Sequence, residues 1–348
     1  MLKYKFFGRS GLRVSEICLG TMSMGQDWPF GADEPTSHDI LSAYRDRGGN
    51  FLDTADKYHN GQTEEFIGRW LGAERHKMVV ATKYTLSMDH ADPNASGNQR
   101  KHMMHAVEES LRRLNTDYID LLWVHAYDKD TPIDETMRGL DDLIRQGKVT
   151  YIGMSDAPAW VISAANTMAE LRGWTQFVGI QAEYNLLTRD LERDLIPMSH
   201  HFDLGVTAWA PLAGGVLTGK YTRAVENDSQ RKAGNEQRGR DSEASLAVAC
   251  EVDNIADDLG VSSTQVAIAW VLAQGYRLFP IAGARKVTQI EDTMAATDVT
   301  LPSDAMARLD ELTQIKLGFP HEFLASDHLA DFIRGEVARH QLRDRPLK

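Results

Sequence analysis

Eight short apolar runs alternate with segments of helical periodicity along almost the whole chain. The runs are VSEICLG, NFLDTA, MVVATKY, IDLLWVHA, TYIGMSD, FVGIQAEYN, LGVTAWAPL and RLFPIAG. Strands buried on both faces read as continuous apolar runs, and alternation of strand with helix indicates a parallel sheet. Eight such units favour a closed (β/α)8 TIM barrel over an open doubly wound sheet, which usually has a G-x-G-x-x-G turn after its first strand. The first run here ends in GTMSMG and lacks that turn.

The segments outside the eight units are expected at the two ends of one domain. The stretch KYKFFGRSGLRVS resembles a β-hairpin, which would lie at the bottom of the barrel. Residues 316–348 form a charged tail that reads as helical in part. We therefore predict one α/β domain over residues 1–348, with an N-terminal β-hairpin and a C-terminal helical extension. Residues 85–99 and the polar stretch 222–242 both exceed ordinary loop length.

Composition and charge narrow the class of partner. The 348 residues are 42% hydrophobic and 25% charged, as in an ordinary soluble globular protein. The net charge is −12 and the basic residues are scattered, so neither nucleic acid nor an anionic membrane is an expected partner. The N-terminus lacks the apolar core of a signal peptide, and we expect a cytoplasmic protein. The 12 histidines lack partners at ligand spacing, so no metal site is expected.

Four reactive side chains fall at the ends of three successive runs. Asp53 closes the second run and Tyr58 follows in its loop, while Lys83 closes the third run and His125 the fourth. Each alone has an ordinary structural reading, as a capping carboxylate, a solvated lysine or a core histidine. In a barrel, however, the C-terminal strand ends meet at the face where the active sites of this fold lie. Their coincidence predicts a proton-transfer site.

The four side chains can act together as one acid. A free phenol has a pKa near 10, and the Lys83 ammonium is expected to bring the pKa of Tyr58 toward the working range. Asp53 would keep Lys83 charged against the loss of water around it. His125 would orient a carbonyl oxygen beside the Tyr58 hydroxyl.

In the contexts FLDTADKY, VVATKY and DLLWVHAYD, these residues resemble those of the aldo-keto reductases, and the resemblance extends over residues 12–312. It implies a barrel enzyme that reduces an aldehyde or ketone reversibly with NADPH, with Tyr58, Asp53, Lys83 and His125 as the catalytic tetrad. NADPH/NADP is the implied cofactor, with NADH as the alternative. The implied partner is a small-molecule carbonyl compound, and the oligomeric state stays open.

By the same resemblance, the later strand ends bind the cofactor. The implied contacts are Gly20, Thr21, Met22, Ser155, Asp156, Gln181, Trp209, Ala210, Pro211, Leu212, Gly215, Leu217, Lys220, Gly283, Arg285, Gln289 and Asp292. Asp156 stands where the family usually has Asn, and an aspartate cannot donate to a carboxamide oxygen. Arg285 is expected to meet the adenosine 2′-phosphate, which favours NADP over NAD. The substrate pocket is expected to include Trp28, Tyr84 and Tyr127.

Three other functions fit part of the pattern. The stretch GGVLTGKY approaches the phosphate-binding G-x-x-x-x-G-K-[ST], but Tyr221 occupies the position of the Ser or Thr. A Schiff-base aldolase would need a neutral Lys83, which a neighbouring Asp53 opposes. A nucleotide-sensing subunit with the same fold and tetrad would bind NADPH without appreciable turnover. The sequence leaves the identity of the substrate open.

Overall fold

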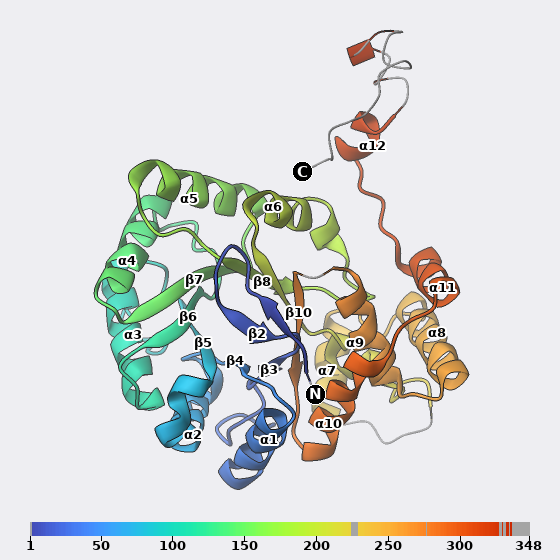
Figure 1. Ribbon diagram of the computed structural model, residues 1–348, viewed down its shortest axis with the longest axis horizontal. Helices are drawn as coiled ribbons and strands as arrows, with labels where there is room; N and C mark the ends of the chain where they lie inside the picture. The colour runs from blue at the N-terminus through green and yellow to red at the C-terminus, as the bar shows by residue number, and fades with distance from the viewer. Residues whose placement is uncertain are drawn as a thin grey trace.

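A computed structural model of the chain describes residues 2–223, 229–275 and 277–326, together with residues 329, 332, 333 and 335. Eight parallel strands close into a barrel in the order β10-β3-β4-β5-β6-β7-β8-β9 (Figure 1). They are β3 (Cys18–Gly20), β4 (Phe51–Asp53), β5 (Val79–Tyr84), β6 (Ile119–Val124), β7 (Val149–Ser155), β8 (Gly179–Glu183), β9 (Gly205–Trp209) and β10 (Leu278–Gly283). Each predicted run contains one of them, which confirms the (β/α)8 barrel.

The predicted hairpin closes one end of the barrel (Figure 1). It consists of the antiparallel strands β1 (Tyr4–Phe6) and β2 (Arg13–Ser15). Phe7 follows β1 and is fully buried, with its ring 5.5 Å from that of Phe51 and 6.2 Å from that of Trp123. A Cβ atom at Gly179 or Gly205 would come within 2.6 or 2.8 Å of the Phe7 ring. The barrel floor therefore needs glycine at these two strand positions.

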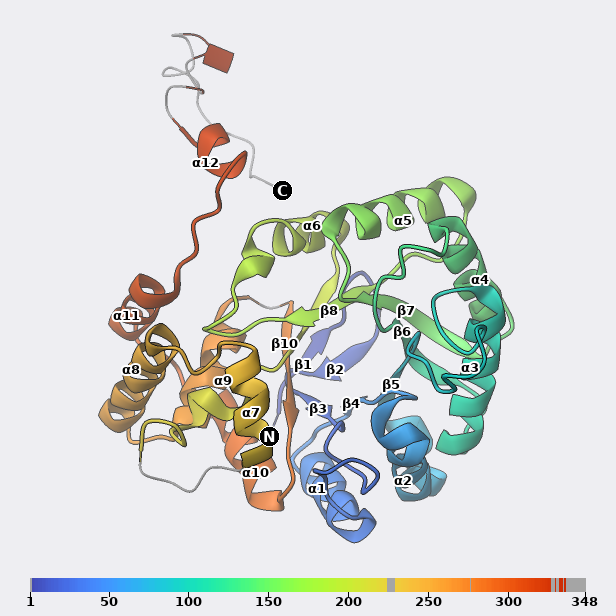
Figure 2. The same ribbon diagram turned by 180° about the vertical axis from the view of Figure 1, so that it is seen from behind.

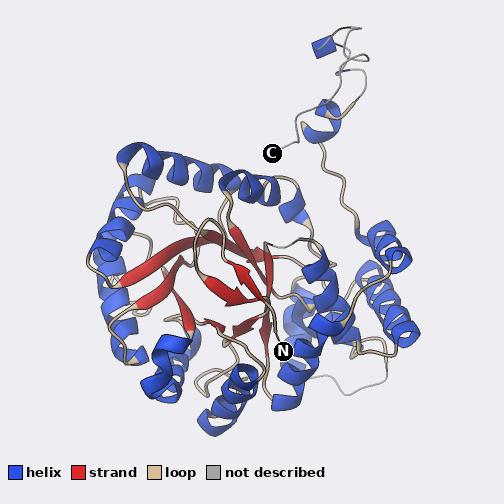
Figure 3. Cartoon of the chain, in the orientation of Figure 1, coloured by secondary structure: helices blue, strands red, loops and turns tan. Residues whose placement is uncertain are grey.

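Helices surround the strands on the outside (Figure 3). The α-helices are α1 (Glu34–Asp46), α2 (Gln62–Leu71), α3 (Arg100–Leu114), α4 (Ile133–Arg145), α5 (Ala159–Arg172), α6 (Leu195–Phe202), α7 (Ser229–Gln237), α8 (Glu243–Leu259), α9 (Ser263–Ala273), α10 (Val287–Ala295), α11 (Ser303–Thr313) and α12 (His321–Leu324). The 3-10 helices are η1 (Tyr58–Gly61), η2 (Gly72–Lys77), η3 (Asp190–Glu192), η4 (Ala213–Thr218) and η5 (Ala296–Asp298). α3 shows why such segments form helices, since Met103, Val107 and Leu111 recur at a spacing of four and are all buried.

The polar stretch 222–242 contains a helix, although its letters show no apolar periodicity. Residues 224–228 lie outside the described part, and α7 follows them. The Asn235 side chain is buried and donates to the carbonyl of Gly214 (3.2 Å) and to the hydroxyl of Tyr221 (2.8 Å). Arg240 forms an ion pair with Glu183 at the end of β8. Tertiary contacts, rather than helical periodicity, hold this segment against the loop after β9.

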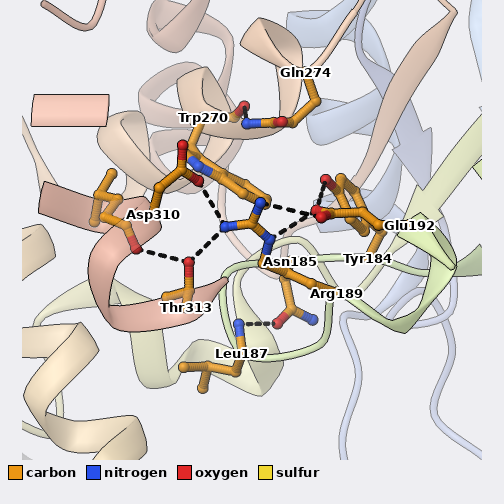
Figure 4. A network of polar contacts seen from close by, with 10 residues as sticks. Tyr184, Asn185, Leu187, Arg189, Glu192, Trp270, Gln274, Asp310 and Thr313 are labelled. Atoms are coloured by element: carbon orange, nitrogen blue, oxygen red, sulfur yellow. Dashed lines mark hydrogen bonds and ion pairs between the residues drawn. The ribbon is translucent and has the colours of Figure 1, made fainter. Parts of the chain in front are cut away.

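A buried arginine fastens the end of α11 to the segment after β8 (Figure 4). Arg189 donates to Glu192 and to Asp310, each over 2.7 Å, and its guanidinium lies 5.2 Å from the centre of the Trp270 ring. Beyond α11 the chain leaves the barrel, and α12 stands apart from it in both views (Figures 1 and 2). Most of the predicted extension over 316–348 lies outside the described residues. Within the ranges that the structure describes, no helix has the length and apolar character needed to cross a membrane.

Candidate active site

The C-terminal ends of β4, β5 and β6 bring the four predicted catalytic residues together. Asp53 is the last residue of β4, and Lys83 lies one residue before the end of β5. His125 follows β6, and its backbone N–H donates to the carbonyl of Tyr84 over 3.0 Å. Because the strands are parallel, these ends lie at the same edge of the barrel.

Lys83 lies at the centre of a buried set of hydrogen bonds. It is 1% exposed, and its Nζ donates to Asp53 Oδ2 (2.5 Å), the Thr54 carbonyl (2.8 Å) and Tyr58 Oη (3.1 Å). These contacts use all three donors of the ammonium group. Asp53 is 2% exposed, and its other oxygen accepts from Gln181 Nε2 over 2.8 Å. The buried ion pair therefore has partners on both sides, which is the condition under which such a pair can stay charged.

Burial and nearby charges set the protonation states of this site. Burial opposes the charge of Lys83, but the Asp53 carboxylate and the Tyr58 hydroxyl together raise its pKa, so the ammonium is retained. Burial raises the pKa of Tyr58 more than Lys83 lowers it, which corrects the expectation of a pKa brought down toward neutrality. Burial, followed by the charge of Lys83, lowers the pKa of His125 to about 3. At neutral pH the site thus holds a protonated phenol, an ammonium and a neutral imidazole.

The Tyr58 phenol lies between two other rings. Its ring centre is 6.1 Å from that of His125 and 6.2 Å from that of Trp28, and both contacts are edge-to-face. All three side chains are partly exposed, whereas Lys83 and Asp53 beneath them are not. His125 Nδ1 is buried and has no hydrogen-bond partner among the described residues. The protonated phenol is thus the accessible end of a charged pair that is otherwise enclosed.

Three of the predicted cofactor contacts lie at the ends of β7 and β9. Ser155 ends β7 and is buried, while Asp156 follows it with a left-handed backbone (φ 46°). Trp209 ends β9, and its indole Nε1 donates to Asp156 Oδ1 over 3.0 Å. These two side chains are therefore engaged with each other across the mouth of the barrel.

The loop after β9 carries the next predicted contacts. These residues differ in whether their backbone or their side chain can face a ligand. Ala210 (φ 51°) and Gly215 (φ 95°) have left-handed backbones, and Pro211, Leu212 and Lys220 lie in the same loop. A Cβ atom at Gly215 would meet, within 4 Å among the described residues, only the hydroxyl of Thr218. The Leu217 side chain is in the core, so only its backbone can face a ligand. Within GGVLTGKY, residues 214–218 lie in η4 and residues 219–221 form a turn rather than the start of an α-helix, which disfavours the phosphate-binding loop of an NTPase.

The predicted contacts on β3 and β10 form a floor that is poor in side chains. Gly283 pairs with Gly20 in register between the two strands. Thr21 is buried, and its hydroxyl donates to the carbonyl of Asp53 over 2.9 Å. Met22 is exposed beside them. A Cβ atom at Gly20 would lie 2.7 Å from Cγ2 of Ile281, so this glycine makes room for a neighbouring side chain, whereas Gly283 is exposed.

Two of the predicted cofactor contacts are already engaged within the protein. The Gln289 side chain accepts from the backbone N–H of Arg285 over 2.8 Å. Asp292 accepts from Ser262 (2.8 Å) and from Gln265 (2.7 Å), which belong to the start of α9. Both side chains thus have a structural function at the base of α10.

The three predicted substrate contacts occupy different positions. Trp28 lies against Tyr58, and Tyr127 packs edge-on against Trp160, which is 66% exposed, with ring centres 6.2 Å apart. Tyr84 is only 1% exposed and belongs to the core. Neighbouring strand residues point to opposite faces, so the inward Lys83 turns Tyr84 outward toward the helices. A substrate contact for Tyr84 does not fit this position.

Two features of the site escaped the sequence analysis. Lys83 uses the backbone carbonyl of Thr54, and no side-chain pattern reports such a contact. His59 is fully buried beside Trp28, with ring centres 4.7 Å apart. Its only sequence signal is the Asn60-Gly61 pair that follows, since this dipeptide is typical of left-handed turns. Among the residues that the structure describes, no group of three or more His, Cys, Asp or Glu could hold a metal ion.

Comparisons with known proteins cover nearly the whole chain. Residues 16–314 match the sequence model of the Aldo/keto reductase family. The chain is 38% identical over 335 residues to the aryl-alcohol dehydrogenase [NADP(+)] of Phanerodontia chrysosporium, covering 89% of this chain and 86% of that protein. It is 35% identical over 325 residues to norsolorinic acid reductase A of Aspergillus parasiticus, with 90% and 82% covered. An aryl-alcohol dehydrogenase of Pestalotiopsis microspora is 36% identical over 324 residues, with 90% and 83% covered.

Proposed function

The chain belongs to the aldo/keto reductase family, and from this premise we propose that it reduces an aldehyde or ketone to the alcohol with NADPH, with Tyr58 as the general acid. It is an oxidoreductase that acts on carbonyl groups. The proposal rests above all on the contacts of Lys83, whose Nζ lies 2.5 Å from Asp53 Oδ2 and 3.1 Å from Tyr58 Oη. This geometry couples a phenolic proton to a buried ion pair.

Each residue of the tetrad would have its own role in the proton transfer. Tyr58 is kept protonated by burial and gives its proton to the carbonyl oxygen. The Lys83 ammonium stabilises the phenolate that this step leaves behind, and Asp53 keeps the ammonium charged. His125 is a neutral imidazole and can donate one ring N–H to the same carbonyl oxygen. When it is bound, the nicotinamide supplies the hydride.

The chemistry of the remaining strand ends supports a nicotinamide cofactor. Among the described residues, only the Thr218 hydroxyl would lie within 4 Å of a Cβ atom at Gly215, which suits a backbone that approaches a pyrophosphate. Arg285 and Lys286 immediately precede α10, and the start of a helix presents unpaired N–H groups to a phosphate. We assign the preference for NADPH over NADH to Arg285, because a guanidinium can contact a phosphate with two parallel hydrogen bonds. Ser155 and Gln181 would hold the carboxamide.

We infer that aromatic carbonyl compounds are among the substrates. Two of the relatives are aryl-alcohol dehydrogenases by name. The aromatic side chains Trp28, Tyr127 and Trp160 are all at least partly exposed, which suits a flat apolar ligand.

A panel of carbonyl compounds, assayed with NADPH and with NADH, tests the proposal. The native protein is expected to oxidise NADPH in the presence of an aromatic aldehyde. Tyr58→Phe should lower kcat by about 10²- to 10⁴-fold, the usual contribution of a positioned acid, with little change in the Kd for NADPH. Full activity of Tyr58→Phe on every substrate would refute the role of the phenol. Tight NADPH binding without turnover would favour a sensor, and borohydride trapping of a substrate on Lys83 would favour an aldolase.

A further inference from the structure

The loop after β3 is wrapped around the ring of His59. Residues 24–32 form this loop, and its neck is closed by a hydrogen bond from Gly25 N to Ala32 O (2.9 Å). A Cβ atom at Gly25 would lie 2.3 Å from Cγ of His59, and one at Gly31 would lie 3.0 Å from its Cε1. Because His59 is fully buried, its ring occupies the interior of the loop. The two glycines are what allow the loop to close so tightly around an imidazole.

The residues that follow His59 hold the same loop from outside. Their hydrogen bonds run from Asn60 Nδ2 to Asp27 Oδ2 (3.1 Å), from Gln26 N to Gln62 Oε1 (2.5 Å) and from Thr63 Oγ1 to Met24 O (2.6 Å). The start of α2 and the loop are therefore a single packed unit, and this unit begins one residue after Tyr58.

A left-handed turn separates Tyr58 from this unit. His59 (φ 47°, ψ 39°) and Asn60 (φ 54°, ψ 38°) are consecutive residues in the left-handed region. This conformation is unfavourable for residues other than glycine and persists where the surroundings demand it, which is common at functional sites. Here it allows Tyr58 to contact Lys83 while the next side chain packs into the loop.

His59 in turn holds Trp28 against Tyr58. The backbone N–H of Trp28 donates to His59 Nδ1 over 3.0 Å, so this nitrogen carries no proton and the ring is the Nε2–H tautomer. The two rings are stacked, with centres 4.7 Å apart and planes inclined by 29°. Burial lowers the pKa of His59, which keeps the ring neutral and Nδ1 able to accept. The indole then lies against the Tyr58 ring, with ring centres 6.2 Å apart and planes inclined by 73°.

We propose that His59 is a positioning residue, which holds Trp28 beside the Tyr58 phenol and so gives the site its preference for planar aromatic carbonyl compounds. The inference rests on the proposed function, because it takes Tyr58 as the acid. An aromatic ring whose carbonyl reaches Tyr58 would lie against the partly exposed indole and gain an aromatic contact. A saturated ring of the same size would fill the space without that contact.

Two aldehydes of matched size test this preference. Benzaldehyde and cyclohexanecarbaldehyde differ in the aromaticity of one six-membered ring. His59→Gly keeps the left-handed turn but removes both the acceptor and the stacking ring. It should raise KM for benzaldehyde by about 3- to 10-fold, the size of one aromatic contact, and leave KM for cyclohexanecarbaldehyde within about twofold. An equal change for both aldehydes would overturn the proposal.

A conservative variant separates positioning from general stability. Asn tolerates a left-handed backbone, and its Oδ1 can take the place of His59 Nδ1 as the acceptor for Trp28. His59→Asn should therefore recover part of the benzaldehyde affinity that His59→Gly loses. Trp28→Leu should cause the same selective loss, and combining it with His59→Gly should add little, because both changes remove one contact. Additive losses, or no rescue by Asn, would contradict the role of His59.

A measurement without substrate tests the hydrogen bond itself. In a ¹⁵N spectrum of the imidazoles, the signal that His59→Asn removes should be that of a neutral ring protonated at Nε2. A ring protonated at Nδ1 would overturn the contact to Trp28. If the native protein reduced neither aldehyde, the proposed reductase function would fail, and the spectrum would still decide whether His59 holds Trp28.

Discussion

The two halves of the barrel mouth differ in what they present to a ligand, which is a fixed set of reactive side chains in one half and exposed backbone in the other. At the ends of β4 and β5, the Lys83 ammonium has three partners and the Asp53 carboxylate is engaged at both oxygens. On the other side, Gly283 is exposed at the end of β10, and a Cβ atom at Gly215, after β9, would have only the Thr218 hydroxyl within 4 Å among the described residues. After their proposed roles we call the first region the acid half, which the protein's own contacts hold together, and the second the cofactor half, which presents exposed backbone to a ligand.

This difference has a physical reason. A proton donor acts best when its charged neighbours are fixed before the reaction, because no reorganisation is then needed in the transition state. A cofactor that must enter and leave requires surfaces that are not filled by the protein's own side chains. Substitutions in the two halves can test whether the acid half is as complete as its contacts indicate, and whether the cofactor half depends on the charges assigned to it.

Lys83→Met removes the ammonium group at the centre of the acid half and should have the largest effect on activity. We expect kcat to fall by about 10²- to 10⁴-fold, because nothing then stabilises the Tyr58 phenolate. The free energy of unfolding should also fall, by about 3–5 kcal/mol, because Asp53 is left as a buried charge without its counter-ion. Steady-state kinetics and urea unfolding measure the two effects.

Lys57→Met is the matched control. Lys57 directly precedes Tyr58 in the chain, but its ammonium donates to the carbonyl of Ser87 (2.8 Å), which is outside the tetrad. Its loss should change kcat by less than about twofold, as for most substitutions away from a site. If the two lysine variants behaved alike, the Lys83 ion pair would not be the feature that distinguishes the acid half.

Asp56 also lies within the acid half, but its carboxyl group differs from that of Asp53 in its hydrogen bonding. Both of its carboxylate oxygens are buried without a hydrogen-bond partner among the described residues, and burial, followed by the charge of Glu64, raises its pKa to about 8. The unfolded chain releases this proton near pH 4, so between about pH 4 and 8 the folded state binds more protons than the unfolded state. Stability should therefore fall as pH rises through this window, by at most about 1.4 kcal/mol per pH unit.

Asp56→Asn should remove this pH dependence. We expect the variant and the native protein to have similar unfolding free energies near pH 5, and the variant to become more stable by a few kcal/mol (about 2–4) near pH 8. Urea unfolding at several pH values measures the difference. A difference that does not change with pH would mean that water in the adjoining cavity of about 430 Å³ solvates the carboxylate.

The sequence was sufficient for the barrel and for predicting that Asp53, Tyr58, Lys83 and His125 lie together at one edge of it. Strands that are buried on both faces appear in the sequence as continuous apolar runs, and the closed barrel brings the residues that follow them to one edge. The sequence was not sufficient to predict the direction in which each strand side chain points. All six positions of β5 are buried, so the run VVATKY does not indicate that Lys83 faces inward and Tyr84 outward.

Other features depended on packing that no local pattern reports. α7 carries no apolar stripe, and its segment is held by Asn235 and by the ion pair of Arg240. The pKa of Tyr58 depends on how much water the folded site removes, and here burial outweighs the ammonium of Lys83. The Asn60-Gly61 pair indicates a left-handed turn, but it does not indicate that the His59 ring is enclosed by residues 24–32. Each of these follows from contacts between segments that are distant in sequence.

Arg285→Ala tests the charge assigned to the cofactor half and should have a smaller effect than Lys83→Met. A charge-assisted hydrogen bond contributes about 1.5–3 kcal/mol, so the Kd for NADPH should rise by about 10- to 100-fold. NADH lacks the 2′-phosphate and serves as the internal control, and its Kd should change little. Equal losses for both cofactors would show that Arg285 supports α10 rather than a phosphate.

Asp156→Asn should have the smallest effect, because the substitution keeps the acceptor for Trp209 Nε1 (3.0 Å) and adds two donors. If Asp156 acts only through hydrogen bonds, the new amide can donate to the carboxamide oxygen, and the affinities for NADPH and NADP⁺ should both rise by about 2- to 10-fold. If the aspartate acts through its charge, its loss should weaken the binding of the positively charged NADP⁺ while NADPH is little affected. Fluorescence titration with both forms of the cofactor separates the two cases, because only a charge effect changes the ratio of the two Kd values. An unchanged ratio with weaker binding of both forms would instead mean that Asp156 mainly orients the Trp209 ring.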